Sequence, residues 1–447
     1  MGADLTRLRP VLALVLLAAV LTACGGTIYF GRSSPNSDRA SDARGGNGPL
    51  LGQQIPSPPP GTTAGSLIAL DSRTGNRLWQ TPVPMGAVSQ PVVANGLVFV
   101  QGGYDCRSTA SGLAAFDAKD GKSMWEAPTT ANRYGFSMCG SEFPPRVGAG
   151  IALTVGTGQT GSASGARPVV HGLDPKTARE LWTTEGEEPA AAPGTVIILV
   201  ASSPASSVYK VRGLNPLTGA QQWEAGVTAS NLTPLIAGET AVVPGTDPNG
   251  DYVSAVDITN GALRWQLHFT HDQQFGGLVL GDVAVYSVNV YSQPMNGQGP
   301  DSGRIVAVDV ATGQELWRQT VTPGVGGPAL AVPRAVYVMQ VEGRSTQRCS
   351  SELAALDSRS GLLKWRYNDS GCPNYWGDLA GDGSTTAIVL GAGSGTKIAV
   401  LDMGTGSKLW EKPIATSGPY PLVQIAVAGG VVYMAVSGRF IAPPPSD

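Results

Sequence analysis

The chain of 447 residues carries a formal net charge of −3, and charged residues make up only 14% of it, against about a quarter in an average soluble protein. No cluster of lysine and arginine is present, which argues against nucleic acid as a partner, because phosphate binding relies on concentrated positive charge. With five cysteines, three histidines and no C-x-x-C pair, a metal site built on cysteine is not expected either.

The N-terminus has the pattern of an export signal. Arg7 and Arg9 precede an unbroken apolar run over residues 11–21, and the stretch "LTAC" sets a small residue before Cys24. The run is too short to span a bilayer, which needs about 18 to 20 apolar residues, so residues 1–23 are predicted to be a cleaved signal peptide. The start "MGADLT" also fits a myristoylation site, but the apolar run behind it favours export.

Cys24 in this setting resembles the lipidated cysteine of bacterial lipoproteins. The resemblance implies acyl chains such as palmitate on Cys24, and an exported protein anchored on the outer face of a bacterial cell membrane or in the inner leaflet of an outer membrane. Residues 24–65 then form the lipidated cysteine and a linker, since 19 of the 40 residues from Gly25 to Ala64 are Gly, Ser or Pro. Such a composition cannot bury a core, so we expect a flexible tether of about 35 Å.

Beyond the linker, one motif occurs eight times. Each copy has an apolar run, an Asp or Asn, a turn that usually ends in Gly, and a Trp, as in "ALDSRTGNRLW" over residues 69–79. The copies are spaced by 41 to 57 residues, the range of one four-stranded propeller blade. Eight of the nine tryptophans occupy this slot, at Trp79, Trp125, Trp182, Trp223, Trp265, Trp317, Trp365 and Trp410.

Each position of the motif has a structural explanation. The apolar run is typical of a strand buried on both faces; Asp or Asn starts a turn, and Gly supplies the positive φ that ends it. The Trp buries a large surface between neighbouring blades. We therefore interpret the motif as scaffold and not as eight active sites. In the third copy Ala178 replaces the Gly, and because a non-Gly residue at positive φ costs about 1 kcal/mol, we expect a different turn there.

A second pair of apolar segments follows each Trp, as in residues 91–101 and 424–438. These segments supply the inner strands A and B of a blade, and the Asp/Trp motif supplies strands C and D. The predicted fold is therefore an all-β, eight-bladed β-propeller of four-stranded blades over residues 66–442, with residues 443–447 as a tail. Because the chain begins with C and D and ends with A and B, the ring closes by pairing the N-terminal C and D strands with the C-terminal A and B strands.

The signature "LDxxTGxxxW" resembles that of the PQQ-binding-like β-propeller repeat family. That family includes quinoprotein alcohol dehydrogenases, the lipoprotein of the outer-membrane protein assembly machine and sensor ectodomains, so the resemblance implies the fold more firmly than one function. The quinoprotein enzymes use a disulfide between adjacent cysteines and a calcium ion, and this chain has no adjacent cysteines. We therefore expect no cofactor and no enzymatic activity. The alternative is a quinone-dependent dehydrogenase with PQQ and calcium, or a small-ligand sensor, that uses the channel mouth.

Other candidate metal ligands have simpler explanations. His268 and His271 would point to opposite faces of an extended segment. The Asp- and Gly-rich stretches at 247–251 and 377–383 could hold calcium, but turns are a sufficient reason for these residues. No metal site is predicted.

The irregular insertions fall in the B–C and D–A connections, which emerge on one face of the ring, whereas the A–B and C–D turns on the other face are short. The four remaining cysteines also lie in these connections, and an even number in an exported protein favours disulfides. We predict the pairs Cys106–Cys139 and Cys349–Cys372, each flanking one Asp/Trp motif. Each should stabilise the fold by about 3 to 4 kcal/mol.

Long irregular loops on a rigid ring are the usual place for recognition, and residues just before each A strand should surround the channel mouth. We expect a non-enzymatic, protein-binding scaffold of the cell envelope, a subunit or accessory of a membrane protein complex. Trp376 and Arg146 are expected to bind this partner without supporting the fold; the alternative for the aromatic residues is packing within their own loops. The candidate binding residues are Gln90, Tyr134, Phe136, Arg146, Asn231, Gln274, Phe275, Tyr375, Trp376, Asp378 and Tyr420.

Overall fold

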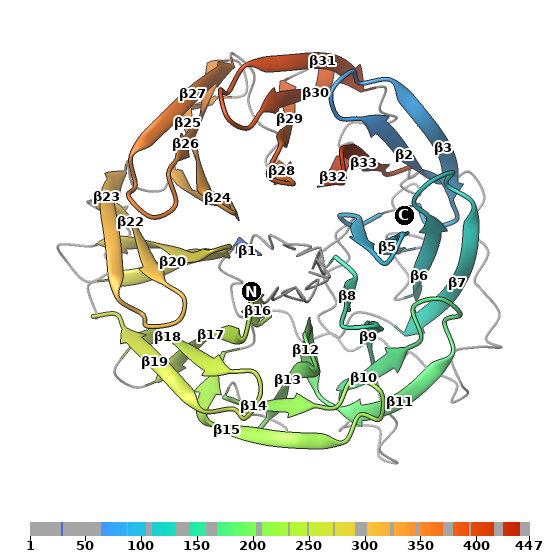
Figure 1. The fold of residues 1–447 in the computed structure, drawn as a ribbon, viewed down its shortest axis with the longest axis vertical. Coiled ribbons are helices and arrows are strands. Elements are labelled where there is room, and N and C mark those ends of the chain that lie inside the picture. Colours follow the sequence, from blue (N-terminus) through green and yellow to red (C-terminus); the bar gives the residue numbers. More distant parts are fainter. Residues whose placement is uncertain are drawn as a thin grey trace, which may run out of the picture.

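In the computed structural model, every regular element of the described residues is a β-strand, and the strands form eight sheets arranged in a ring (Figure 1). The structure describes residues 28–29, 64–86, 88–103, 110–130, 144–157, 168–202, 208–230, 233–247, 250–270, 273–290, 302–321, 326–345, 348–369, 379–392, 395–414 and 423–438. Each sheet is a four-stranded antiparallel blade, as predicted, and blade 6 carries one strand more.

The blades are numbered in chain order from the one that contains Trp79, and the strands of each run from A at the centre to D at the rim (Figure 1). The A strands of blades 1 to 8 are β32 (Val423–Ala428), β4 (Val92–Ala94), β8 (Arg146–Gly148), β12 (Glu187–Ala192), β16 (Leu235–Ala237), β20 (Gln273–Leu280), β24 (Gly326–Val332) and β28 (Leu379–Gly381). The B strands are β33 (Val431–Val436), β5 (Leu97–Gly103), β9 (Ile151–Thr157), β13 (Thr195–Ala201), β17 (Thr240–Asp247), β21 (Val283–Val290), β25 (Ala335–Ser345) and β29 (Thr385–Ala392).

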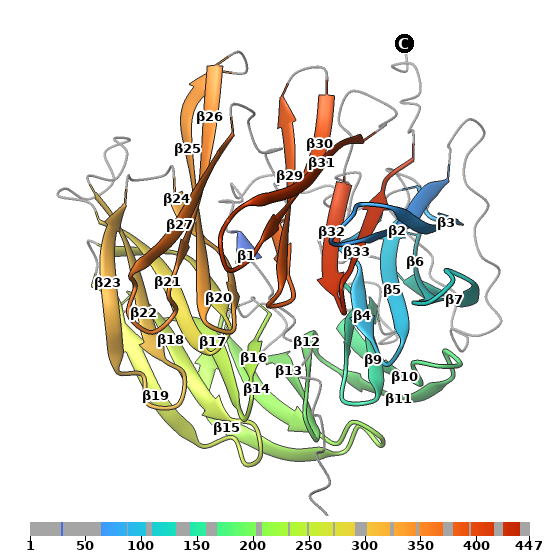
Figure 2. The ribbon, with the colours of Figure 1, turned by 45° about the horizontal axis from the view of Figure 1, so that its top comes forward.

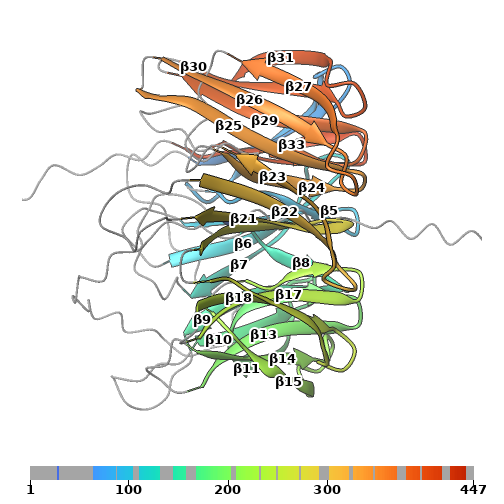
Figure 3. The ribbon, with the colours of Figure 1, turned by 90° about the vertical axis from the view of Figure 1, so that its left-hand side faces the viewer.

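The Asp/Trp motif supplies the two outer strands, as predicted. The C strands are β2 (Gly65–Asp71), β6 (Ala110–Asp117), β10 (Pro168–Leu173), β14 (Tyr209–Leu214), β18 (Gly250–Asp257), β22 (Ser302–Asp309), β26 (Arg348–Leu356) and β30 (Gly395–Asp402). The D strands are β3 (Arg77–Val83), β7 (Ser123–Thr130), β11 (Glu180–Glu185), β15 (Gln221–Ala229), β19 (Leu263–His268), β23 (Glu315–Val321), β27 (Leu363–Asp369) and β31 (Lys408–Ile414). Seen edge-on, the strands run across the thickness of the ring (Figure 3).

The ring closes through blade 1, which both ends of the propeller build. Strand β2 pairs antiparallel with β33, from Ser66 opposite Val436 to Asp71 opposite Val431. The sheet order is β3-β2-β33-β32, which confirms the predicted pairing of N-terminal C and D strands with C-terminal A and B strands. Without this pairing, the N-terminal C and D strands and the C-terminal A and B strands would each expose an unpaired strand edge.

Burial along the strands follows their place in the blade. The B strand β13 is buried at all of its positions but the last, because blades pack against both of its faces. The D strand β15 alternates exposed and buried residues from its second residue on, as expected for a strand with one face toward solvent. Hydrophobic clusters such as the one around Ile197, Val211 and Val256 join neighbouring blades, so the core is a set of layers between blades.

The eight signature tryptophans fasten each blade to the next. Every indole Nε1 donates to the backbone carbonyl of the residue that follows the signature Asp or Asn of the next blade, over 2.7 to 3.1 Å. In blade 8, Trp410 donates to the carbonyl of Ser72 and so completes the ring. This repeated contact is called the clasp below, and it confirms that the motif is scaffold.

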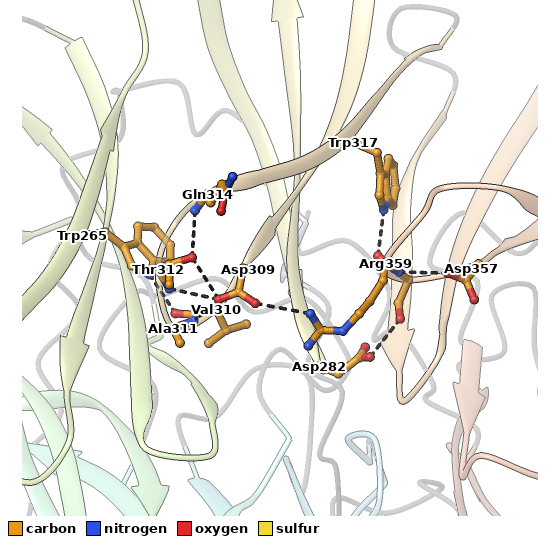
Figure 4. Close-up of polar contacts among 11 residues, drawn as sticks. Trp265, Asp282, Asp309, Val310, Ala311, Thr312, Gln314, Trp317, Asp357 and Arg359 are labelled. Atoms are coloured by element: carbon orange, nitrogen blue, oxygen red, sulfur yellow. Dashed lines mark hydrogen bonds and ion pairs between the residues drawn. The ribbon is translucent and has the colours of Figure 1, made fainter.

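The turn that receives each indole is held by its own Asp (Figure 4). In blade 6, Asp309 Oδ1 accepts hydrogen bonds from the backbone N–H of Ala311 and Thr312 at 3.0 and 3.1 Å, while Trp265 donates to Val310. In blade 7, Ser358 receives Trp317 on its carbonyl and donates its hydroxyl to Asp282 in the A–B turn of blade 6, at 2.9 Å. The Asp side chain therefore holds the turn whose backbone carbonyl accepts the indole hydrogen bond.

The turn in blade 3 corrects one prediction. A different turn was expected at Ala178, but Ala178 has φ +58° and its N–H donates to the carbonyl of Asp174, as the Gly does in the other copies. Trp125 still donates to Pro175 at 2.9 Å. The prediction was wrong because the packing of the neighbouring blade fixes the turn even where the local residue disfavours positive φ.

Candidate functional site

The inner wall of the ring is built from the A strands, and three of the predicted binding residues fall on its described part. Gln90 precedes β4 and donates its side-chain amide to the carbonyl of Ile425 in β32 over 3.0 Å. It therefore joins the inner strands of blades 2 and 1. Phe275 lies in β20, half-buried, and Arg146 is the first residue of β8.

A chain of polar contacts connects three consecutive blades. Arg146 of blade 3 donates through Nη2 to the hydroxyl of Thr233, two residues before the A strand of blade 5, at 2.8 Å. Thr233 in turn donates to Oε2 of Glu188 in β12 of blade 4. Thr233 is buried, at 5% exposure, and the other two side chains are half-buried. These three residues, Arg146, Thr233 and Glu188, are called the inner-wall network below.

The backbone under Glu188 is irregular. Glu188 has φ +47° and follows Gly186, at φ +153°, by two positions. The pairing of β12 with β13 shifts register between Glu187 and Ala190, so the two glutamates sit on a bulge. A non-Gly residue at positive φ costs about 1 to 2 kcal/mol. The bulge therefore places two acidic residues in a strand that is otherwise apolar. Bulges are common beside functional sites.

The charge on Glu188 is balanced between opposing effects. Burial raises the pKa of the Glu188 carboxyl above its ordinary value, and the neighbouring Glu187 adds to the rise, while the Thr233 hydroxyl and the Arg146 guanidinium oppose it. Glu187 itself is only 3% exposed. In the inner-wall network, a cation, a hydroxyl and a carboxylate from three different blades therefore come together.

Arg146 thus makes a contact between blades that the sequence did not predict, and its role in partner binding stays a prediction. Its guanidinium joins blade 3 to blade 5 and lies next to the half-buried Glu188. The sequence did not point to Thr233, Glu187 or Glu188. A signal was present in "EEPAAA", where two adjacent glutamates open an apolar A strand, a departure from the apolar composition that a strand at the blade centre normally has.

Phe275 packs against its neighbours. Its ring stacks on Phe269 with centroids 5.6 Å apart, and Phe269 also meets Tyr286 edge-on at 5.3 Å. This arrangement favours the alternative of local packing for Phe275. The backbone of Gln274 lies in β20, next to Phe275; its side chain lies outside the described residues.

The remaining predicted site residues fall outside the part of the chain that the structure describes. Their roles in lipidation, disulfide bonding and partner binding stay predictions, and the residues are Cys24, Cys106, Cys139, Cys349 (side chain), Cys372, Tyr134, Phe136, Asn231, Tyr375, Trp376, Asp378 and Tyr420.

The stretches considered for metal binding form ordinary structure where they are described. His268 is exposed and contacts the Gln266 amide at 3.1 Å, and Asp382 accepts backbone N–H bonds from Ser384 and Thr385 in a turn. Over the described ranges, no group of three or more His, Cys, Asp or Glu residues is placed to hold a metal ion. The same residues contain no helix long and apolar enough to cross a membrane.

The sequence of the whole ring matches a known family. The family is described as outer membrane protein assembly factor BamB, and the matches extend over residues 60–141, 111–293 and 252–442. The chain belongs to this BamB family. The membership agrees with the PQQ-like repeats that the sequence predicted and with the closed eight-bladed ring.

Two curated proteins that are similar to this chain have different described functions. The outer membrane protein assembly factor BamB of Burkholderia pseudomallei (strain K96243) is 24% identical over 240 residues, which are 51% of this chain and 56% of that protein. The polyvinylalcohol dehydrogenase of Sphingopyxis sp. (strain 113P3) is 26% identical over 220 residues, 41% of this chain and 34% of the enzyme. The chain thus spans about half or less of the length of these relatives.

Solved structures of both kinds resemble this BamB family member in fold. BamB from Moraxella catarrhalis has a TM-score of 0.43 at 14% identity, covering 78% of this chain and 99% of that one. The quinohemoprotein alcohol dehydrogenase from Comamonas testosteroni has a TM-score of 0.44 at 16% identity, covering 85% of this chain and 73% of that one. The likeness to both is one of fold alone.

Proposed function

We propose that this chain is a non-enzymatic, protein-binding scaffold of the cell envelope, a subunit or accessory of a membrane protein complex. The observation that carries the proposal is the clasp: all eight signature tryptophans bind the turns of the next blade. The residues that recur are used to build a rigid ring. Recognition is then left to what differs between blades, which is the inner wall and the B–C and D–A connections.

The family adds the class of partner. The family and the Burkholderia pseudomallei relative are described as outer membrane protein assembly factors, and this supports an envelope protein as the partner. The "LTAC" stretch, which ends at Cys24, supports a lipid anchor on that residue, which would hold the ring at the membrane surface where such a partner lies.

A second candidate function is a quinone-dependent dehydrogenase. The similarity to a polyvinylalcohol dehydrogenase favours it. Against it, the sequence has no adjacent cysteines, and the inner-wall network occupies part of the central wall with a cation and a carboxylate already paired through Thr233. A scaffold should copurify with a protein partner, whereas a quinone-dependent enzyme should copurify with quinone and calcium.

The proposal is tested on the full mature chain, tagged at the C-terminus and crosslinked in cells before affinity purification and mass spectrometry. We expect one envelope protein to be enriched, and we expect Trp376→Ala to reduce its recovery several-fold. Leu217→Ala is the matched control, since Leu217 is 65% exposed in a C–D turn on the opposite face. Purified protein that instead carries a quinone absorbance and calcium, and reduces an electron-accepting dye, would establish the enzyme.

A further inference from the structure

The A strand of blade 6 is the longest of the eight described A strands. Each A strand pairs with B on one side and turns its other edge toward the channel. The A strands of blades 2, 3, 5 and 8 have three residues, those of blades 1, 4 and 7 have six or seven, and β20 has eight. An exposed strand edge presents a row of unpaired N–H and C=O groups that another strand can bind, and β20 offers the longest such row among the described A strands.

A strand from the beginning of the chain lies on this edge. Residues Ile28–Tyr29 form β1, which pairs antiparallel with β20 and makes blade 6 a five-stranded sheet of order β1-β20-β21-β22-β23. Ile28 is opposite Leu278 and Tyr29 is opposite Gly277. Figures 1 and 2 both place β1 inside the ring beside β20. Part of the segment expected to be a flexible tether is therefore a strand.

The sequences on both sides of the contact favour strand addition. In β20, Gly276 and Gly277 lie at a register shift of the β20–β21 pairing, and glycines in a strand often mark a place where another backbone approaches closely. The next A strand, β24, also begins with two glycines. The linker is rich in Gly, Ser and Pro, yet it contains "TIYF" over residues 27–30, a run of β-branched and aromatic residues with high strand propensity.

We propose that the channel-facing edge of β20 is a strand-addition site and that its occupant is the chain's own segment around Ile28–Tyr29. The chemistry it takes is an extended apolar peptide, held by main-chain hydrogen bonds in an antiparallel register. The strand pairing does not depend on the proposed function, whereas its consequence for the membrane anchor does. If Cys24 carries lipid as proposed, the four-residue step from Cys24 to Ile28 spans at most about 14 Å, so the contact holds the ring close to its anchor instead of at the end of the full linker.

The test uses hydrogen exchange in the full mature chain carrying Ile28→Pro and Tyr29→Pro, since proline removes the N–H donors of β1. Amides in the peptide 273–280 that face the channel should exchange at least about tenfold faster than in the unmodified chain. Amides of the other blades should be unchanged, which shows that the variant is folded. The matched control is Ser41→Pro with Asp42→Pro, the same change elsewhere in the linker.

A synthetic peptide of residues 25–34 should restore protection when it is added to the proline variant, and a scrambled peptide of the same composition should not. Unchanged exchange of 273–280 in the proline variant would overturn the proposal. So would a failure of the native peptide to restore protection, because the edge would then not accept the segment as a strand.

Discussion

At the rim of the short-turn face, eight tryptophans make one contact eight times, from Trp79 onto Ala118 round to Trp410 onto Ser72. At the inner wall, the A strands vary from three to eight residues. The polar contacts there, such as that of Arg146 with Thr233, do not recur from blade to blade. The first region repeats because every blade must solve the same packing problem. The second departs from the repeat where blades 3, 4 and 5 share the inner-wall network and where blade 6 receives β1. In this ring, repetition marks the scaffold and departures from it mark candidate sites.

Removing a clasp should have the largest effect. Trp265 is only 8% exposed and its indole donates to Val310 at 2.8 Å, so Trp265→Ala should lower the free energy of unfolding by about 3 to 5 kcal/mol. Trp365→Ala removes an equivalent contact, with Trp365 at 7% exposure, and should cost a similar amount. Denaturant unfolding followed by circular dichroism measures both. A loss below about 1 kcal/mol in either variant would show that the clasp is not what holds the blades together.

Acid should affect the two regions in opposite directions. The Thr259 hydroxyl, followed by Arg264, lowers the pKa of Asp257 in a clasp turn from 3.8 to about 2. Because the folded state favours the ionised form, this stabilisation is complete above the ordinary pKa and is lost as pH falls from about 4 to about 2. Asp257→Asn should therefore destabilise the protein by about 1 to 2 kcal/mol at neutral pH and reduce the loss of stability in acid.

Glu188 provides the comparison within the same experiment. Burial raises its pKa, so the folded state favours the protonated form, and stability decreases as pH rises through the ordinary carboxyl range to the raised pKa. Glu188→Gln should remove this decrease. Melting temperatures measured across pH for both variants check the signs, and identical pH profiles for the two variants would refute the assignment of opposite electrostatics.

Breaking the inner-wall network should have an intermediate effect. Arg146→Ala leaves the buried Thr233 hydroxyl and the half-buried Glu188 without this cation, and it should cost about 1 to 2 kcal/mol. Adding Glu188→Gln should recover part of the loss, because the uncompensated charge is removed. Arg77→Ala is the matched control, since Arg77 is exposed on an outer strand and donates to Gln80. Equal losses for Arg146→Ala and Arg77→Ala would mean that the network adds nothing to stability.

The smallest effect is expected where the repeat itself is imperfect. Ala178→Gly places the usual residue at φ +58° and should stabilise the protein by about 0.5 to 1 kcal/mol. The reverse change, Gly121→Ala, should destabilise it, because a Cβ at Gly121 would lie 2.4 Å from the Trp79 ring at φ +74°. Thermal unfolding compares the two. A destabilised Ala178→Gly variant would show that the alanine methyl contributes packing that outweighs its strained backbone.

The ring could be predicted because its information is local. An Asp followed by a Gly, and then by a Trp in the next strand, defines a turn and its packing partner within each copy, and the spacing of the copies defines the blades. Ala178 was misjudged because local φ preference was given more weight than the neighbouring blade, which fixes the same turn.

The inner wall could not be predicted in the same way. Arg146 and Thr233 are 87 residues apart, and Thr233 and Glu188 are 45 residues apart, so no spacing within the sequence links them. The pairing of Tyr29 with Gly277 crosses most of the chain and depends on an edge that exists only once the ring is closed. Contacts of this kind form only when the whole ring has closed, so the sequence of a single repeat does not predict them.

Photo-crosslinking from single positions on the two faces tests the central claim most directly. A photo-reactive amino acid replaces Trp376, in the connection from β27 to β28, or Leu217, in a C–D turn that is exposed on the short-turn face. If the chain is a scaffold whose irregular face binds a protein, crosslinking in cells should yield one discrete envelope adduct from position 376 and none from position 217. An adduct from position 217 alone, or none from either position in protein that carries a bound quinone, would contradict the account.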